Sequence, residues 1–181
     1  MNFLKLIKQR QSVRSYTDQP VEKEKLYQCL EAARLAPSAS NSQPWKYIIV
    51  DDEELKNKVA DATYDKLVKF NKFALQAPVI IVIVLEKPKI VTQMGIEIKK
   101  REWPLIDIGI STEHFCLQAA ELGLGTCMIG WFDQKRIQEL LHIPKKKTIG
   151  LLITLGYAPD DYPLRKKSRK ENSEVISNNK Y

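Results

Sequence analysis

Hydrophobic positions along this chain follow helical spacing in some stretches and strand patterns in others, with short polar turns between them. Over residues 22–36 the apolar side chains recur at the i, i+3, i+4, i+7 spacing of one buried helix face, and Pro37 ends this predicted helix. Residues 78–85 form a continuous apolar run, which is typical of a strand covered on both faces. We therefore expect this strand at the centre of a sheet.

The same reasoning predicts the other elements, which follow one another without repeats or a low-complexity linker. Residues 87–103 lack a clear period, although 93–100 has the composition for a turn or two of helix. We predict helices over 3–8, 22–36, 53–75 (one helix or two), 105–124 and 133–141, and strands over 45–50, 78–85, 126–130 and 148–157.

The predicted helix over 105–124 is apolar on most of its sides, unlike an ordinary surface helix. Its polar residues are mainly Asp107, Glu113, His114 and Glu121. Such a helix needs cover on more than one face. It therefore either runs through the middle of the domain or forms a subunit interface.

The chain has 181 residues, a length that supports one domain with a substantial core. We predict a single α+β domain over 1–170 and a tail over 171–181. The longest apolar run is far shorter than the ~20 residues that cross a bilayer, and the N-terminal segment lacks the apolar core of a signal peptide. These patterns predict a cytoplasmic protein without a membrane partner.

The net charge of +7 is unevenly distributed. Residues 145–181 hold nine Lys and Arg against four Asp and Glu, so most of the excess lies near the C-terminus. This region is either a solvated tail or part of a site for an anion. The basic residues are not interleaved with aromatic residues and no nucleic-acid-binding motif appears, so we expect no nucleic acid partner.

Side chains that carry catalysis by themselves are scarce. Cys29, Cys116 and Cys127 are odd in number and far apart, which argues against a disulfide framework or a zinc site and fits a reducing compartment. Neither histidine lies beside a nucleophile motif, no metal-binding motif is present, and no P-loop or complete dinucleotide-binding glycine motif appears. We expect no metal. If the protein is an enzyme, its reactive group comes from a bound cofactor.

Two segments could hold such a cofactor. Arg10, Ser12 and Arg14 lie at alternate positions, so extended backbone would point them the same way as a clamp for phosphate, although arginines in surface loops are commonly only solvated. The segment 36–45 offers hydroxyl and amide groups between two prolines. It could grip a polyhydroxylated or heteroaromatic ligand, or be a helix C-terminal loop built from Asx and ST turns.

In four ordered blocks the sequence resembles the nitroreductase family of FMN-dependent, NAD(P)H-using oxidoreductases. The blocks bracket nearly the whole chain. The second block is by itself highly specific for this family. The first and third blocks are specific only when they occur together with the others, and the last is weak evidence by itself. They are 10–16 (RQSVRSY), 36–45 (APSASNSQPW), 119–126 (AAELGLGT) and 167–169 (KSR).

The resemblance implies a three-layer α+β fold, with a mostly antiparallel sheet between helices, and an intertwined homodimer with two FMN sites at the subunit interface. It also implies a set of site residues. The residues implied around the phosphate and ribityl chain are Arg10, Gln11, Ser12, Arg14, Lys167 and Arg169, and those in a loop lying along the flavin from the other subunit are Pro37, Ser38, Ala39, Ser40 and Asn41. The residues implied at a strand end, with backbone N–H groups near flavin N5, are Met128, Ile129, Gly130 and Trp131. A further contact from the middle of the chain falls at Asn71 or Lys72.

Many relatives have Glu at the position of Gly130, so only a backbone contact carries over there. The chemistry that the resemblance implies is ping-pong: NADH or NADPH gives a hydride to the flavin, and a nitroaromatic, quinone or enone acceptor then takes it. The stretch 87–104, including Trp103, is expected to shape acceptor binding. Two alternatives stay open, a flavoenzyme of the same fold with other chemistry (reductive dehalogenation or flavin fragmentation) and a non-enzymatic basic flavin-binding protein.

Overall fold

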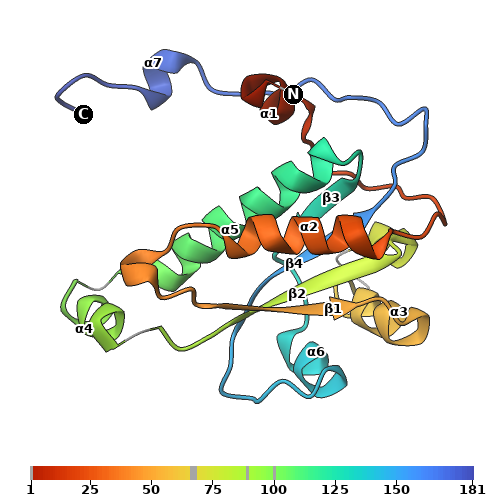
Figure 1. Ribbon diagram of the computed structural model, residues 1–181, viewed down its shortest axis with the longest axis horizontal. Coiled ribbons are helices and arrows are strands. Elements are labelled where there is room, and N and C mark those ends of the chain that lie inside the picture. The colour runs from red at the N-terminus through yellow and green to blue at the C-terminus, as the bar shows by residue number, and fades with distance from the viewer. Residues whose placement is uncertain (1, 66–68, 89, 100) are drawn as a thin grey trace.

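The computed structural model describes residues 2–65, 69–88, 90–99 and 101–181, and four antiparallel strands in this part of the chain form one sheet (Figure 1). The strand order is β1-β2-β4-β3, so β2 lies inside the sheet and the prediction of a central strand is confirmed. Trp45 pairs with Leu85 at one end of β2, and Val79 pairs with Leu155 at the other. The strands are β1 (Trp45–Val50), β2 (Val79–Leu85), β3 (Gly125–Ile129) and β4 (Ile149–Gly156).

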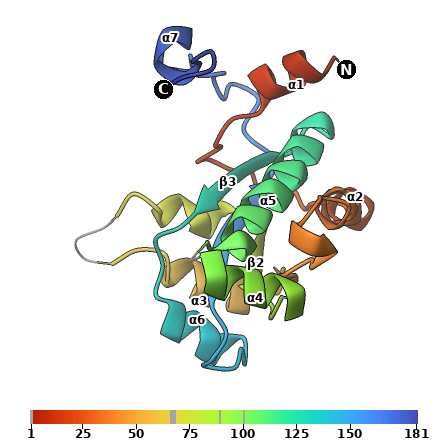
Figure 2. The same ribbon diagram turned by 90° about the vertical axis from the view of Figure 1, so that its left-hand side faces the viewer.

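Helices cover both faces of the sheet, which gives three layers (Figure 2). Side chains of α2 and α5 pack with Ile81 and Ile153 on one face, and side chains of α3 and α6 pack with Ile80 and Leu152 on the other. The expected three-layer α+β fold is therefore confirmed. The helices are α1 (Phe3–Gln9), α2 (Lys23–Arg34), α3 (Glu53–Asp61), α4 (Ile90–Lys99), α5 (Trp103–Glu121), α6 (Gln134–Leu140) and α7 (Asn172–Val175), with 3-10 turns η1 (Ala39–Asn41) and η2 (Lys72–Gln76).

Several helix boundaries differ from the sequence prediction. Of the one helix or two predicted over 53–75, the structure has α3, which ends at Asp61 near the hydrogen bond from the Thr63 hydroxyl to the Ala60 carbonyl, and the 3-10 turn η2; positions 66–68 lie outside the described residues. Helix α4 begins earlier than the predicted 93–100, of which position 100 is not described. Helix α5 begins before Pro104, since a proline needs no N–H partner in the first turn.

Helix α5 ends at Glu121, and Gly123 follows its C-cap residue Leu122. Gly123 has φ +77°, a left-handed conformation that favours glycine. Leu124 N–H donates to the Ala119 carbonyl, and Gly123 N–H donates to the Ala120 carbonyl. These are the two hydrogen bonds of a Schellman motif, which turns the chain directly from α5 into β3.

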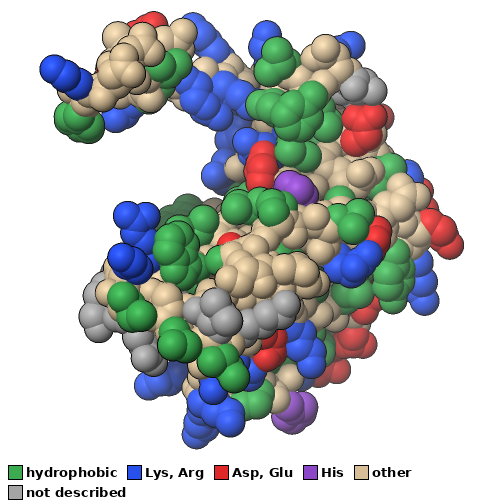
Figure 3. Space-filling view, turned by 60° about the vertical axis from the view of Figure 1, so that its left-hand side comes forward, with side chains coloured by type: hydrophobic (Ala, Val, Ile, Leu, Met, Phe, Trp, Pro, Cys, Tyr) green, Lys and Arg blue, Asp and Glu red, His purple; other side chains and the backbone are tan. Residues whose placement is uncertain are grey.

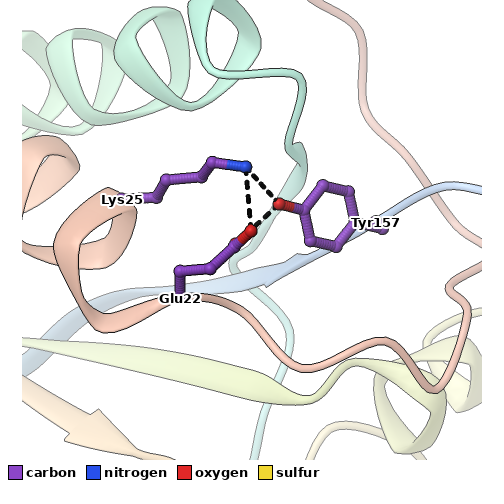
Figure 4. Close-up of polar contacts among 3 residues, drawn as sticks. All are labelled: Glu22, Lys25 and Tyr157. Atoms are coloured by element: carbon purple, nitrogen blue, oxygen red, sulfur yellow. Dashed lines mark hydrogen bonds and ion pairs between the residues drawn. The ribbon is translucent and has the colours of Figure 1, made fainter.

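A polar cluster ties the start of α2 to the end of β4 (Figure 4). The Tyr157 hydroxyl donates to Glu22 at 2.6 Å and accepts from Lys25 Nζ at 2.5 Å, and Lys25 also pairs with Glu22 at 3.1 Å. The tyrosine hydrogen bond is the main reason that the pKa of Glu22 falls to about 2. Glu22 therefore stays ionised over the whole ordinary pH range.

Beyond β4 the chain continues as an extended segment, here called the C-terminal arm (residues 158–181), which passes beside α1 and carries α7 out past the body (Figure 1). Neither α1 nor α7 has a buried residue. Phe3 and Leu4 of α1, and Val175 and Ile176 at the end of α7, are exposed. Both ends of the chain thus carry apolar side chains without cover in a single copy.

The structure adds three observations on the remaining expectations. No helix formed by the described residues is long and apolar enough to cross a membrane. Over the same residues, no three His, Cys, Asp or Glu side chains gather as metal ligands would. The three cysteines are buried and unpaired, and burial raises the pKa of Cys29 and Cys116 to about 12, so these thiols stay protonated.

Candidate functional site

The first sequence block runs as an extended segment beside edge strand β3. Ser12 bridges Thr126 in parallel register, and Val13 N–H donates to the Thr126 carbonyl at 2.8 Å. Val13 points into the core over Gly125, where an added Cβ would lie 2.7 Å from a Val13 methyl carbon. Val13 faces inward as the alternation predicts, while Gln11, which the alternation would place on the other face, lines a surface hollow together with Arg10, Ser12 and Arg14.

This hollow has a volume of about 260 Å³ and lies where the C-terminal arm leaves the body. Figure 3 shows basic side chains gathered in this area. Six cationic side chains, and no carboxylate, are among the described residues of its lining. The lining consists of Arg10, Gln11, Ser12, Arg14, Arg165, Lys166, Lys167, Ser168 and Arg169.

The arm is held against the first block by hydrogen bonds on both sides of the hollow. Gln11 Nε2 donates to the Pro163 carbonyl at 3.1 Å, and Gln11 Oε1 accepts from Arg165 N–H at 3.1 Å. Lys167 Nζ donates to the Lys8 carbonyl at 2.5 Å. Both ends of the Gln11 amide are thus engaged by the arm, and what Gln11 does in the structure is to dock the arm beside the clamp.

The positive charge of the side chains that line the hollow exceeds the negative charge of the protein's own carboxylates beside them. Partial burial, and after it the charges of Arg10, Arg169 and Arg165, lower the pKa of Lys167. Arg10 Nε lies 3.3 Å from a Glu113 carboxylate oxygen, and it is buried without a hydrogen-bond partner of good geometry. Several guanidinium and ammonium groups around an incompletely satisfied donor fit an anion with several oxygens, such as a phosphate monoester.

The end of β3 leads away from this hollow. Met128, Gly130 and Trp131 are exposed while Ile129 is buried, and an added Cβ at Gly130 would meet no atom within 4 Å. The backbone is therefore open to a ligand at this point. Four residues separate the bridged position of β3 from Gly130, or about 13 Å at 3.3 Å per residue. One elongated ligand could span both places.

Asn71 lies beneath this strand end. Its side chain is buried, and Nδ2 donates to the Thr63 carbonyl at 3.1 Å and to the Trp131 carbonyl at 3.2 Å. The structure thus brings Asn71 to the predicted strand-end contact and leaves its side-chain oxygen as the remaining acceptor.

The predicted flavin loop within the second block, Pro37 to Asn41, lies far from the hollow in the same chain. It precedes β1, the edge strand opposite β3. From β1 to the Ser12 segment is four strand spacings, or about 19 Å. The structure therefore does not bring the predicted loop, which includes Ser38, Ala39 and Ser40, to the predicted phosphate clamp within one chain. Trp103 is half-buried at the start of α5, 3.8 Å from an added Cβ at Gly95 of α4, and so also lies away from the hollow.

Sequence reasoning missed several members of this arrangement. Arg165 and Lys166 line the hollow, and their signal was the basic stretch over residues 165–170, in which only Ser168 is uncharged. The Tyr162 hydroxyl accepts from Arg14 N–H at 2.9 Å, and Glu113 pairs with Arg10. Neither of the last two carries a local sequence signal, because each depends on how the arm and α5 approach the first block.

Known proteins resemble this chain over nearly its full length. A protein of Archaeoglobus fulgidus, provisionally named an NADH dehydrogenase/NAD(P)H nitroreductase, is 31% identical over 98% of both chains. A Bacillus subtilis FMN reductase [NAD(P)H] is 33% identical over 78% of this chain and 60% of its own. The solved structure of an FMN-dependent nitroreductase from Clostridium difficile R20291 is 31% identical, covers 99% of this chain and 100% of its own, and superposes with a TM-score of 0.76.

Other chemistry occurs among the relatives as well. An iodotyrosine deiodinase of Thermotoga neapolitana is 26% identical over 87% of this chain and 89% of its own. The family model described as "Nitroreductase family" matches residues 7–157, which include the first three sequence blocks. With the resemblance in the sequence and the three-layer fold, this match shows that the chain belongs to the nitroreductase family.

Proposed function

We propose that this protein is an FMN-dependent oxidoreductase that uses NADH or NADPH to reduce small-molecule acceptors such as nitroaromatics and quinones. The observation that carries the proposal is the cationic hollow, in which Arg10 and Arg14 from one end of the chain meet Lys167 and Arg169 from the other. Relatives named as FMN-dependent nitroreductase and FMN reductase support the choice of cofactor.

A bound FMN supplies hydride transfer between the nicotinamide donor and the acceptor. The protein's own contribution is to bind and orient. The guanidinium groups of Arg10 and Arg14, the Ser12 hydroxyl and the arm cations hold the phosphate. The backbone N–H groups of Gly130 and Trp131 are the proposed donors at the strand end, where fixed dipoles stabilise developing negative charge. No side chain acts as a nucleophile in the proposed reaction.

We further propose that the functional unit is an intertwined homodimer. The loop over residues 37–41 and the hollow lie at opposite edges of one sheet, so a site that uses both needs a second copy. In a two-fold dimer the same surface is used by both subunits. Ile106 and Ile110 of α5, and the apolar residues of α1 and the arm, are exposed in a single copy and would form its interface. Residues 171–181 would then be a tail that packs on the partner.

Steady-state kinetics test the proposed chemistry. With NADH or NADPH and a quinone or nitroaromatic as the two varied substrates, a ping-pong reaction gives parallel double-reciprocal lines. Intersecting lines would rule out a ping-pong order, and no turnover by the flavin-loaded protein with any acceptor would favour the non-enzymatic flavin-binding alternative.

Reductive dehalogenation is the second candidate, and the deiodinase relative is the observation that favours it. The stretch 87–104, which includes α4 and Trp103, is where acceptor choice would be determined. Release of iodide from an iodinated phenol, at a rate comparable with quinone reduction, would move the assignment to that chemistry. We place either activity in the cytoplasm, where the three unpaired cysteines would stay reduced.

A further inference from the structure

The loop before β1 holds backbone conformations that residues other than glycine rarely adopt. Ser40 and Asn41 have φ +51°, and Gln43 has φ +48°. Such conformations persist only where the surrounding structure fixes them. Inside the loop, Ser38 Oγ accepts from Gln43 N–H at 2.9 Å, and Gln43 Nε2 donates to Asn41 Oδ1 at 2.9 Å. Two side chains from elsewhere in the fold hold the loop from outside.

Asp107 of α5 holds one side. It is only 4% exposed, and its two carboxylate oxygens accept from Ala39 N–H at 3.1 and 3.2 Å. No cation pairs with Asp107 among the described residues. Burial raises its pKa. Burying a carboxylate without a cation costs folding free energy, and an apolar residue at this helix position would be buried at lower cost. The presence of Asp107 is therefore explained by the Ala39 N–H group that it holds in place.

Thr92 of α4 holds the other side. It is also 4% exposed, and its hydroxyl donates to the Ala39 carbonyl at 3.3 Å and lies 2.7 Å from the Ser42 hydroxyl. Because a hydroxyl has one hydrogen, the Ser42 hydroxyl then donates to Thr92. The peptide groups on both sides of Ala39 are therefore fixed, immediately before the left-handed Ser40.

We propose that Asp107 and Thr92 are positioning residues that together set the conformation of the loop at residues 38–43, and that Thr92 ties α4 to this loop. The inference rests on the proposed function for the role of the loop in flavin binding. Asp107 then governs how the loop meets the flavin from the neighbouring subunit. Thr92 transmits the loop position to α4, the helix proposed to shape the acceptor site.

Amide hydrogen exchange tests the structural part without any cofactor. In the full-length protein, Asp107→Ala is expected to speed exchange in peptides covering residues 37–44 by about tenfold or more, as loss of a bond to a charged group does, while Asp107→Asn, which keeps an oxygen acceptor, recovers most of the protection. Thr92→Val is expected to speed exchange by about two- to tenfold and Thr92→Ser to restore it. Peptides covering α2 serve as the control for global loosening.

Equal exchange in Thr92→Val and Thr92→Ser, or wild-type exchange in Asp107→Ala and Thr92→Val alike, would overturn the proposal. If Asp107→Ala fails to fold, the pair Thr92→Val and Thr92→Ser still decides the question.

Kinetics then separate the inference from the proposed function. Thr92→Val is expected to raise the KM for the acceptor by about two- to tenfold at an unchanged rate of flavin reduction by NADH or NADPH, and Thr92→Ser is expected to restore it. The visible circular dichroism of bound flavin is expected to change in Asp107→Ala and to be largely restored in Asp107→Asn. A wild-type protein that binds no flavin would refute the proposed function, and the exchange data would still stand for the loop. If the wild-type protein binds flavin and is active, but the KM for the acceptor is unchanged in Thr92→Val, the proposed coupling between the loop and α4 is refuted and the proposed function stands.

Discussion

At the residue scale, the clamp depends on side chains at alternate positions of an extended segment. Arg10, Ser12 and Arg14 could be assigned to one face from the sequence, because the two-residue period of extended backbone is local information. Glu113 and Asp107 could not be assigned roles, because the partner of each lies far away in the chain. Placement of a side chain was therefore predictable where it follows from spacing, and contacts that follow from packing were not.

Removal of Arg14 tests the clamp. Arg14→Ala deletes a charge-assisted contact in the hollow, worth roughly 1.5–3 kcal/mol, so FMN affinity is expected to fall by about 10- to 150-fold. Titration of the flavin-free protein, followed by quenching of flavin fluorescence at constant salt, measures the change. Arg136→Ala, an exposed arginine on α6 outside the hollow, is the matched control. Equal affinities in the two variants would remove Arg14 from the site.

At the element scale, the junctions between helices and strands were predicted well where a cap or glycine marks them. Asp133 is the first residue of the helix predicted over 133–141, and its side chain caps α6 by accepting from Arg136 N–H. The end of α3 and the start of α4 were not located, because no cap or glycine in the sequence marks them. Apolar periodicity predicts that a helix exists, while its exact length depends on what it packs against.

Gly125, the first residue of β3, allows the segment that contains Val13 to lie close to this strand. In Gly125→Ala the new Cβ would lie 2.7 Å from a Val13 methyl carbon, so the variant is expected to lose about 1–3 kcal/mol of unfolding free energy through overpacking. Urea denaturation measures the loss. Combination with Val13→Ala removes both methyl carbons and leaves the residue-13 Cβ at 2.9 Å from the added carbon. This relieves part of the clash, so the double variant is expected to be more stable than the sum of the two single losses predicts. If the losses of unfolding free energy in the two single variants simply add in the double variant, residues 125 and 13 are not in contact.

The cluster at the start of α2 gives the fold a defined acid response. The pKa of Glu22 is about 2 in the folded protein against an ordinary 4.5, so its stabilising contribution is complete above pH 4.5 and is lost as the pH falls from 4.5 toward 2. Tyr157→Phe removes the main cause of this shift, and its acid unfolding midpoint is expected at a higher pH than that of the wild type. Tyr27→Phe, an exposed tyrosine on α2, is the control. An unchanged midpoint in Tyr157→Phe would show that the cluster contributes nothing in acid.

At the scale of the whole molecule, the fold class could be predicted and the completeness of the site could not. The apolar α5 was expected to lie either in the middle of the domain or at a subunit interface, and in one copy it packs on the sheet while leaving Ile106 and Ile110 exposed. Only the structure shows that the loop and the hollow lie at opposite edges of one sheet. Strand order is a property of the assembled sheet, and local patterns do not fix it.

Mixed dimers test whether two chains share each site. Arg14→Ala damages the hollow, and Ser40→Pro damages the loop because proline cannot adopt φ +51°. If each site takes its hollow from one subunit and its loop from the other, a mixed dimer of the two variants has one intact site and one doubly damaged site. Refolding the variants together is then expected to restore activity that neither has alone. No recovery, with mixed dimers present, would place both parts of each site in one chain.

The most direct test of the central claim is the visible absorption spectrum of the purified protein, recorded before and after anaerobic addition of NADH and then NADPH. The proposed function predicts a yellow protein, carrying flavin held by the cationic hollow, whose absorption bleaches with one or both donors. A colourless protein that also fails to take up added FMN would contradict it.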